Sequence, residues 1–405
     1  MTPEPLLLVA DHVTGGIEVF AVPGGTRVAR LPGPRVSEHA GFLALPGGRV
    51  ACVDEAAGEL LVLDPSAALA GGPLVAATAP VAVPGEHLAA DATGERIAVT
   101  TGVGERAEPW SDLVTAVDLR AGAATAVRAR TGEPGVTVVG AGAAALVLLR
   151  QREPGELALY RHAGLLAAGP GHPRAVPLAR LPLPDDGHGD AHDPATGLVF
   201  AATGEGVYRA RVRGTALLPE PPLPWRGAGR GYFLRLDPGR RLLWSCLRGG
   251  PGDPARWPEW TNTAWCHGLD SGRTALVDLG PGLVFRMALA RGAAAFTRVH
   301  PDGDELLLLD PARPRVAART PLEPMSGAPR RGGTPWDGVQ RRAVAASPGA
   351  DWVAVSRGGH GEVLIVDART GRPGTVLRTR TPLPEGGRLA MVSAGDRGHE
   401  DAVGR

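Results

Sequence analysis

The chain has 405 residues, of which 43% are hydrophobic, and its formal net charge is +1. A net charge so close to zero argues against electrostatically driven binding to nucleic acid or to a membrane surface. All 43 basic residues are arginine, which excludes a lysine Schiff base and a phosphate-loop lysine. Because 58 glycines and 39 prolines break the apolar residues into short runs, the sequence predicts many short elements and a finely divided core.

A short apolar strand recurs along the whole chain at intervals of about 50 residues, the spacing of a repeating four-stranded unit. The eight copies are Leu6–Ala10, Val50–Val53, Ile97–Thr100, Ala145–Leu149, Leu198–Ala202, Leu242–Leu247, Ala293–Val299 and Trp352–Ser356. Each copy is the second strand of its unit, and a third strand follows it; several of these third strands end in an aspartate such as Asp64, Asp310 or Asp367. We interpret these aspartates as turn residues, because Asp accepts hydrogen bonds from the backbone just beyond it.

A leading first strand precedes each copy and a weaker fourth strand completes the unit, with no amphipathic helix pattern between them. This order predicts an all-β fold, a β-propeller of four-stranded blades forming one domain over residues 1–405. Eight blades fit best, and seven remain possible because residues 287–340 are irregular. The chain begins with a second-type strand, so we expect Gly387–Val392 to supply the missing innermost strand and close the ring.

Three segments carry a family resemblance: Glu59–Asp64 (ELLVLD), Ser347–Val355 (SPGADWVAV) and Glu362–Gly371 (EVLIVDARTG). The repeat resembles the YVTN or quinoprotein-amine-dehydrogenase-like propeller superfamily, which also lies near the WD40-like propellers. The resemblance implies the fold and no particular activity. The tryptophan-docking repeats of quinone-cofactor dehydrogenases and the Trp-Asp signature of WD40 repeats are absent, and no motif indicates a nucleotide, haem or quinone cofactor.

Cellular context can be inferred only from cysteines and apolar runs. Cys52, Cys246 and Cys266 lie in apolar strands and have no zinc-ligand spacing, which indicates buried thiols, although Cys246 and Cys266 could face each other across a hairpin. No export signal and no bilayer-length apolar run is visible, so we expect a cytoplasmic protein without a membrane partner.

Loops of such a ring divide between its two faces. The loops between second and third strands lie on the face where the innermost strands begin, and in this chain they are long and rich in tryptophan. We take four tryptophans as candidate ligand contacts: Trp110, Trp257, Trp260 and Trp336. The alternative is that each tryptophan only fills the surface between blades.

When the starts of the innermost strands are aligned, two kinds of side chain fall at the axis: histidines in some blades and arginines in others. Histidines stand at these positions in three blades, as His39, His87 and His188, and can form a three-imidazole metal site for zinc, iron or copper. Asp190 and His192 lie further along one of these strands as conditional ligands. Glu38 and Glu86 can orient the rings as secondary partners. The alternative is an ordinary polar channel.

Arginines occupy the equivalent positions in the other blades, namely Arg230, Arg286, Arg342 and Arg388. Guanidinium groups can hold a carboxylate or phosphate through paired hydrogen bonds, so these arginines predict an anionic ligand.

Three functional hypotheses follow. The first is a propeller that binds a small anionic molecule with help from a metal, and that, if it is an enzyme, acts as a lyase, hydrolase or oxygenase. The second is an interaction scaffold that binds a protein through its tryptophan loops. The third is a metal carrier that resembles zinc-chaperone propellers. The sequence leaves open which of the three applies and whether the protein is an enzyme.

Overall fold

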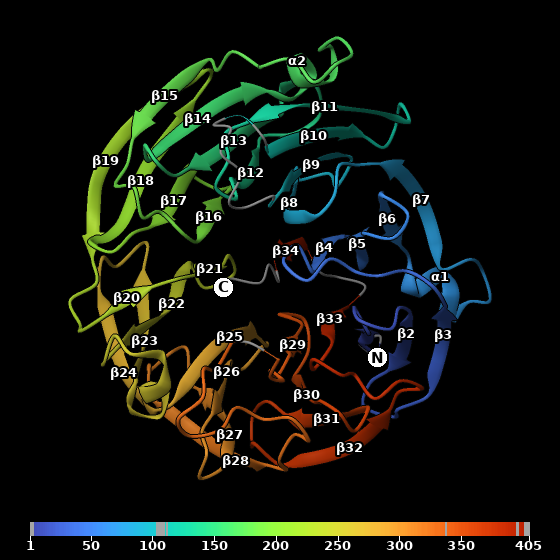
Figure 1. Ribbon diagram of the computed structural model, residues 1–405, viewed down its shortest axis with the longest axis vertical. Helices are drawn as coiled ribbons and strands as arrows, with labels where there is room; N and C mark the ends of the chain where they lie inside the picture. Colours follow the sequence, from blue (N-terminus) through green and yellow to red (C-terminus); the bar gives the residue numbers. More distant parts are fainter. Residues whose placement is uncertain (1–3, 103–109, 111, 337, 394–396, 401–405) are drawn as a thin grey trace.

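The computed structural model describes residues 4–102, 110, 112–336 and 338–393, and the backbone of residues 397–400. Eight antiparallel sheets stand in a ring around a central axis (Figure 1). The chain therefore forms an eight-bladed β-propeller, which confirms both the all-β prediction and the favoured blade count.

Every blade has its innermost strand at the axis and its outermost strand at the rim. Blade 1 contains, in that order, β33 (Arg388–Val392), β1 (Leu6–Ala10), β2 (Ile17–Ala21) and β3 (Arg27–Leu31). Blade 2 contains β4 (Phe42–Pro46), β5 (Arg49–Asp54), β6 (Glu59–Leu63) and β7 (Val75–Pro80). Blade 3 contains β8 (Gly85–Ala90), β9 (Arg96–Thr101), β10 (Asp112–Asp118) and β11 (Ala123–Ala129). Blade 4 contains β12 (Gly135–Val139), β13 (Leu146–Gln151), β14 (Glu156–Arg161) and β15 (Ala179–Pro182).

The second half of the ring repeats the order. Blade 5 contains β16 (Asp190–Asp193), β17 (Leu198–Ala202), β18 (Gly206–Arg213) and β19 (Ala216–Pro224). Blade 6 has a divided innermost strand, β20 (Arg230–Gly231) and β21 (Arg235–Asp237), followed by β22 (Leu242–Gly249), β23 (Thr261–Gly268) and β24 (Thr274–Pro281). Blade 7 contains β25 (Leu283–Leu289), β26 (Ala294–Val299), β27 (Asp304–Leu309) and β28 (Val316–Leu322). Blade 8 contains β29 (Val344–Ala346), β30 (Trp352–Arg357), β31 (Glu362–Asp367) and β32 (Pro373–Arg378).

The two ends of the chain meet in blade 1. Strand β33 pairs antiparallel with β1, with Leu8 opposite Ala390, so the predicted ring closure is confirmed. A further strand, β34 (Arg397–Glu400), pairs with the inner edge of β4 in blade 2. Its register sets Arg397 opposite Pro46 and Glu400 opposite Leu43, so β34 runs beside the axis towards the start of β4.

One apolar cluster lies at each of the eight interfaces between neighbouring blades, and a ninth, around Trp257 and Trp260, packs the β22–β23 loop against blade 7. Strand β1 shows how this arises from alternation along a strand. Leu6 and Leu8 pack towards blade 2, whereas Leu7 and Val9 pack towards blade 8. Each such side chain contributes about 1.5–3 kcal/mol when it is fully buried. Both faces of a blade are covered, so its second strand is a continuous apolar run that makes the repeat visible in the sequence.

The turn aspartates act as predicted. Asp310 accepts a hydrogen bond from the backbone N–H of Ala312 at 2.9 Å, and Asp367 accepts one from Arg369 at 2.9 Å. Asp64 accepts from the N–H of Ala67 and so caps a helix that was not predicted. The short helices are α1 (Pro65–Leu69), α2 (His162–Leu166), η1 (Gly142–Ala144) and η2 (Pro254–Glu259). All four are too short to produce a visible helical period.

The cysteines are buried and free. Cys246 and Cys266, which could have faced each other across a hairpin, do not, because the β22–β23 register sets Cys246 opposite Ala264 and Cys266 opposite Trp244. Burial raises the pKa of both thiols to about 12. Within the ranges that the structure describes, no helix has the length and apolar character needed to cross a membrane.

Candidate functional site

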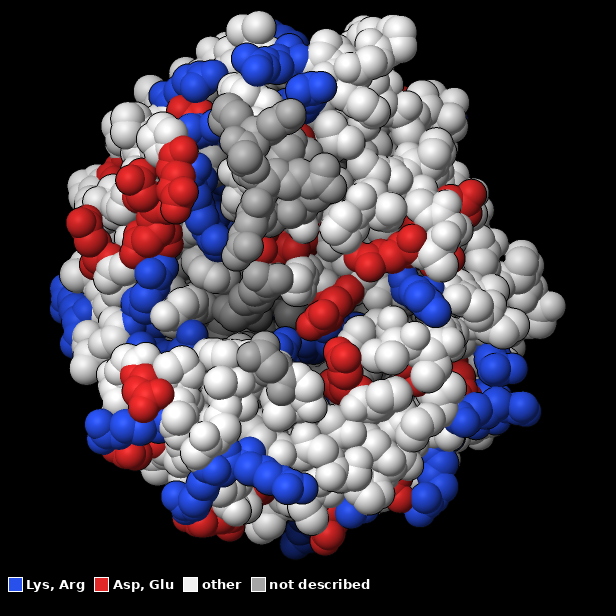
Figure 2. Space-filling model, viewed as in Figure 1, with Lys and Arg blue, Asp and Glu red and all other residues white. Residues whose placement is uncertain are grey.

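The candidate site is the axial mouth, the end of the central channel where the innermost strands begin. Figure 2 shows this face hollowed near its centre, with both acidic and basic side chains around the hollow. The aligned histidines and arginines all lie within three residues of the start of an innermost strand. The fold therefore gathers them at one end of the ring, but their side chains have different partners.

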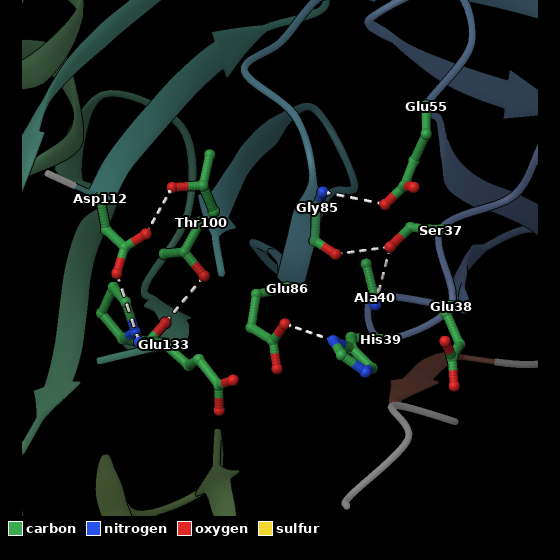
Figure 3. A network of polar contacts seen from close by, with 12 residues as sticks. Ser37, Glu38, His39, Ala40, Glu55, Gly85, Glu86, Thr100, Asp112 and Glu133 are labelled. Atoms are coloured by element: carbon green, nitrogen blue, oxygen red, sulfur yellow. Dashed lines mark hydrogen bonds and ion pairs between the residues drawn. The ribbon is translucent and has the colours of Figure 1, made fainter. Parts of the chain in front are cut away.

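On the side of blades 2 and 3, an acid holds one imidazole in place (Figure 3). Nδ1 of His39 lies 2.5 Å from a carboxylate oxygen of Glu86, which is only 4% exposed. Glu86 stands in a bulge of β8, where the pairing with β9 shifts register between Gly85 and His87. The bulge frees the Glu86 side chain from strand alternation and turns it towards the neighbouring blade. The structure thus places Glu86 as the partner of His39.

The turn that carries His39 is fastened to the same bulge (Figure 3). The hydroxyl of Ser37 donates to the carbonyl of Gly85 at 2.5 Å and accepts the N–H of Ala40 at 3.3 Å. The N–H of Gly85 donates to Glu55 at 3.2 Å. These bonds join the starts of β4 and β8, so the His39–Glu86 pair has a firm backbone on both sides.

Next to the His39 turn, on the side of blades 7, 8 and 1, lies a guanidinium cluster formed by Arg286, Arg341 and Arg388. Glu38 is the acid that faces it, with carboxylate contacts of 3.4 Å to Arg341 and 3.5 Å to Arg388. Nε of Arg388 also donates to the backbone carbonyl of Glu38 at 2.9 Å. Burial alone would raise the pKa of Glu38, but neighbouring positive charges, first among them Arg388, outweigh burial and lower it. Glu38 therefore acts as a counter-ion for the arginines, and His39 is a further neighbour that lowers its pKa.

Arg286 is the member of the cluster without a hydrogen-bond or ion-pair partner among the described residues. It stands in a bulge of β25, where pairing with β26 shifts register between Val284 and Met287. Burial, and then the positive charge of Arg388, hold its pKa well below the usual value for arginine. A guanidinium in this position is a donor without an acceptor.

The structure places Arg342 differently from the other predicted arginines. Its Nε donates to Asp304 at 2.7 Å, and its other nitrogens donate to the backbone carbonyls of Ser356 and Glu323. The preceding residue, Arg341, faces Glu38, because successive residues of an extended segment point to opposite sides. Arg341 thus holds the mouth position that the sequence assigned to Arg342.

Blades 4 to 6 complete the mouth with side chains that are already paired. Nη1 of Arg230 donates to Asp186 at 2.8 Å. The ring of His188 meets the edge of Tyr232 at 5.3 Å between centroids. Burial, followed by the charge of Arg152, holds the pKa of His188 well below its ordinary value, so the ring is neutral at physiological pH.

Asp190 and His192 lie on the side of β16 that faces blade 4. Asp190 accepts from Nε of Arg150 at 2.8 Å, and Gly135 leaves room for this pair, because a Cβ there would lie 2.1 Å from the Asp190 carboxylate. Nε2 of His192 is buried and has no hydrogen-bond partner within the described part of the chain. Burial lowers the pKa of His192 to about 4. Both residues belong to the interface between blades 4 and 5.

The predicted tryptophan contacts are mostly buried. Trp257 is 0% exposed and donates to the carbonyl of Arg330 at 3.3 Å. Trp260 is 7% exposed and donates to the carbonyl of Pro251 at 2.9 Å. Trp110 is half-buried beside the guanidinium of Arg174, 4.8 Å from its ring centroid. These contacts hold the loops together, and binding of a partner protein through the tryptophans stays a prediction.

Sequence reasoning missed an aromatic box on the mouth side of blades 6 to 8. It consists of Tyr232, Trp260, Phe285 and Trp336, and it surrounds the guanidinium of Arg248. Trp336 connects it, with ring centroids 5.4 Å from Trp260 and 5.1 Å from Phe285. The signal available in the sequence was that Arg248 ends a second strand directly before a tryptophan-bearing loop.

The predicted metal centre finds no support in the geometry. Across residues 4–393, apart from the few positions outside the described set, no three His, Cys, Asp or Glu side chains come close enough to share an ion. His87 and His188 do influence each other electrostatically, as the positive field of His87 helps to lower the pKa of His188.

No protein-family model matches the chain, and no curated protein matches it. Solved structures do. Apo AztD from Citrobacter koseri is 13% identical, with a TM-score of 0.63 over 99% of this chain and 100% of that one. A second crystal structure of Citrobacter koseri AztD gives a TM-score of 0.65 at 13% identity, over 97% of this chain and 98% of that one. Dihydro-heme d1 dehydrogenase NirN, in complex with DHE, is 16% identical, with a TM-score of 0.61 over 97% of this chain and 76% of that one. At such low identity these likenesses confirm the propeller resemblance and show the fold alone.

Proposed function

We propose that the protein binds a small molecule carrying an acidic group at the axial mouth, with the guanidinium cluster as its receptor. The observation that carries the proposal is Arg286. It is half-buried beside two further arginines, and no acceptor for its N–H groups exists among the described residues.

The charge balance of the cluster supports an anionic ligand. Among the described residues, Glu38 is the one carboxylate that forms an ion pair with the cluster, and it contacts Arg341 and Arg388 but not Arg286. A buried charge without a partner is costly, and the cost falls when an anion supplies both charge and acceptor atoms. Residues that lower the stability of the folded protein in this way are typical of binding sites, where they are kept because the ligand needs them. Arginine suits the task, because its planar fork can donate two parallel hydrogen bonds to a carboxylate or phosphate.

The proposal assigns binding and no reaction. A divalent ion held by the three mouth histidines, His39, His87 and His188, stays a prediction, because the described side chains form no three-ligand group. Neither a catalytic activity nor a cytoplasmic location is derived from the geometry, and both stay predictions.

The test is calorimetric titration with benzoate and with inorganic phosphate, against sodium chloride at equal ionic strength. Wild-type protein is expected to bind at least one of the two acids saturably, and Arg286→Gln is expected to abolish that binding. Arg313→Gln is a matched control, because the Arg313 side chain is 77% exposed and its one ion pair with a described residue is with neighbouring Asp310. Equal heats for all salts, or unchanged binding in Arg286→Gln, would contradict the proposal.

A further inference from the structure

Arg248 has an environment unlike that of the other mouth arginines. Its guanidinium carbon lies 4.2 Å from the ring centroid of Tyr232, 5.0 Å from Trp260 and 5.2 Å from Trp336. A fourth ring, that of Phe285, lies at 5.8 Å. In the portion of the chain that the structure describes, its side chain has neither a hydrogen bond nor an ion pair. The aromatic box thus holds a cation whose five N–H donors are unused.

Arg230, the nearest arginine, has an acidic partner and so shows what the position of Arg248 lacks. Arg230 stands directly opposite Arg248 in the β20–β22 pair, and its guanidinium also lies over Tyr232, at 4.9 Å. Like charges opposite each other destabilise a sheet. Asp186 neutralises Arg230 through a contact of 2.8 Å, whereas only ring faces stabilise Arg248. A guanidinium that is held by ring contacts alone keeps its N–H donors for another partner.

Phe285 connects the aromatic box to the guanidinium cluster. Its ring lies 5.8 Å from the Arg248 guanidinium and 5.2 Å from that of Arg341, so the two cations are no farther apart than the sum of these distances. The backbone carbonyl of Trp336 accepts from Arg341 at 3.4 Å, while its ring lies against Arg248. Two groups of guanidinium donors therefore flank one aromatic surface.

We infer that the ligand of the mouth carries two acidic groups on a flat body, one acid held by the guanidinium cluster and the other by Arg248, with the body against Phe285 and Trp336. This inference rests on the proposed function and adds the number of acidic groups and the shape of the ligand. An acid group stands about 3 Å from each donor nitrogen, so a few atoms between the two acids are sufficient to bridge the span. A flat body suits the site, because aromatic faces gain from stacking.

Three matched probes test the inference by calorimetry: isophthalate has two acids on a flat ring, benzoate has one, and cyclohexane-1,3-dicarboxylate has two on a puckered ring. Wild type is expected to bind isophthalate at least about ten-fold more tightly than either other probe, the usual gain from one further charge-assisted bond. Arg248→Gln should bring isophthalate to the benzoate level and leave benzoate unchanged. If the glutamine variant fails to fold, Arg248→Lys takes its place, because it keeps a cation among the rings. The lysine lacks the planar fork, so this variant should also lower the ratio of isophthalate affinity to benzoate affinity.

The outcomes separate the two proposals. If wild type binds neither these probes nor inorganic phosphate beyond the chloride control, the proposed function fails. If it binds phosphate but none of the three probes, the proposed function stands and the two-acid inference is overturned. If benzoate and isophthalate bind equally and both require Arg286, the proposed function stands and the two-acid inference is overturned. An isophthalate-to-benzoate ratio unchanged in both Arg248 variants overturns it as well. Equal binding of isophthalate and the cyclohexane probe overturns the flat-body part.

Discussion

Two arginines at the axial mouth are expected to respond in opposite directions when their charge is removed. Arg286 has no partner among the described side chains and faces other guanidiniums, whereas Arg342 pairs with Asp304 at 2.7 Å. Arg286→Gln should therefore raise the free energy of unfolding of the ligand-free protein, and Arg342→Gln should lower it.

The magnitudes follow from what each substitution leaves behind. Arg286→Gln removes a poorly solvated charge and its repulsion from Arg388, a gain of about 1–3 kcal/mol. Arg342→Gln leaves the carboxylate of Asp304, only 7% exposed, without its cation, a loss of about 3–5 kcal/mol. In a chain of this length each kcal/mol moves the melting temperature by about 1–2 °C.

Urea unfolding followed by tryptophan fluorescence measures both variants, with Arg313→Gln as the exposed control that should change little. The pKa of Arg286 is lowered by folding, so the folded state binds its proton less readily than the unfolded state. The penalty is therefore complete below the lowered pKa of the folded state and is lost as pH rises from there to the pKa of the unfolded state, so the advantage of Arg286→Gln should not grow as pH rises. A destabilised Arg286→Gln, or an advantage that grows with pH, would refute the reasoning.

Three further predictions are independent of the ligand. Gly135→Ala should cost at least about 2 kcal/mol in urea unfolding, because the new Cβ would lie 2.1 Å from the Asp190 carboxylate; wild-type stability would show that the buried ion pair can move. Burial lowers the pKa of His192 to about 4, so the unfolded chain takes up a proton more readily and stability should fall as pH drops from about 6.5 to 4. His192→Gln should flatten this fall, and an identical pH profile would contradict the assignment. Metal analysis of purified protein should give the same content for wild type and for a variant lacking the three mouth histidines; a stoichiometric ion lost only from the variant would restore the predicted metal centre.

Much of the fold could be predicted because it depends on local signals. Both faces of every blade are buried, so second strands such as Leu198–Ala202 are short apolar runs at a fixed interval. Ring closure followed from the missing innermost strand at the start of the chain. The turn aspartates were recognisable, because their hydrogen bonds reach only the next few residues. The alignment of innermost strands also brought the correct segments to the mouth.

What the side chains do at the mouth was decided by tertiary structure. Bulges in β8 and β25 and the break between β20 and β21 redirect Glu86, Arg286 and Tyr232, and no residue pattern announces such irregularities. The choice between Arg341 and Arg342 depends on which faces Asp304, an acid 37 or 38 residues away in the chain. The sequence by itself determined the ring and the residues that reach its axis, because strand period and blade interval are local. Only the packing of blades against one another decided which of these charges are neutralised and which are left to meet a ligand.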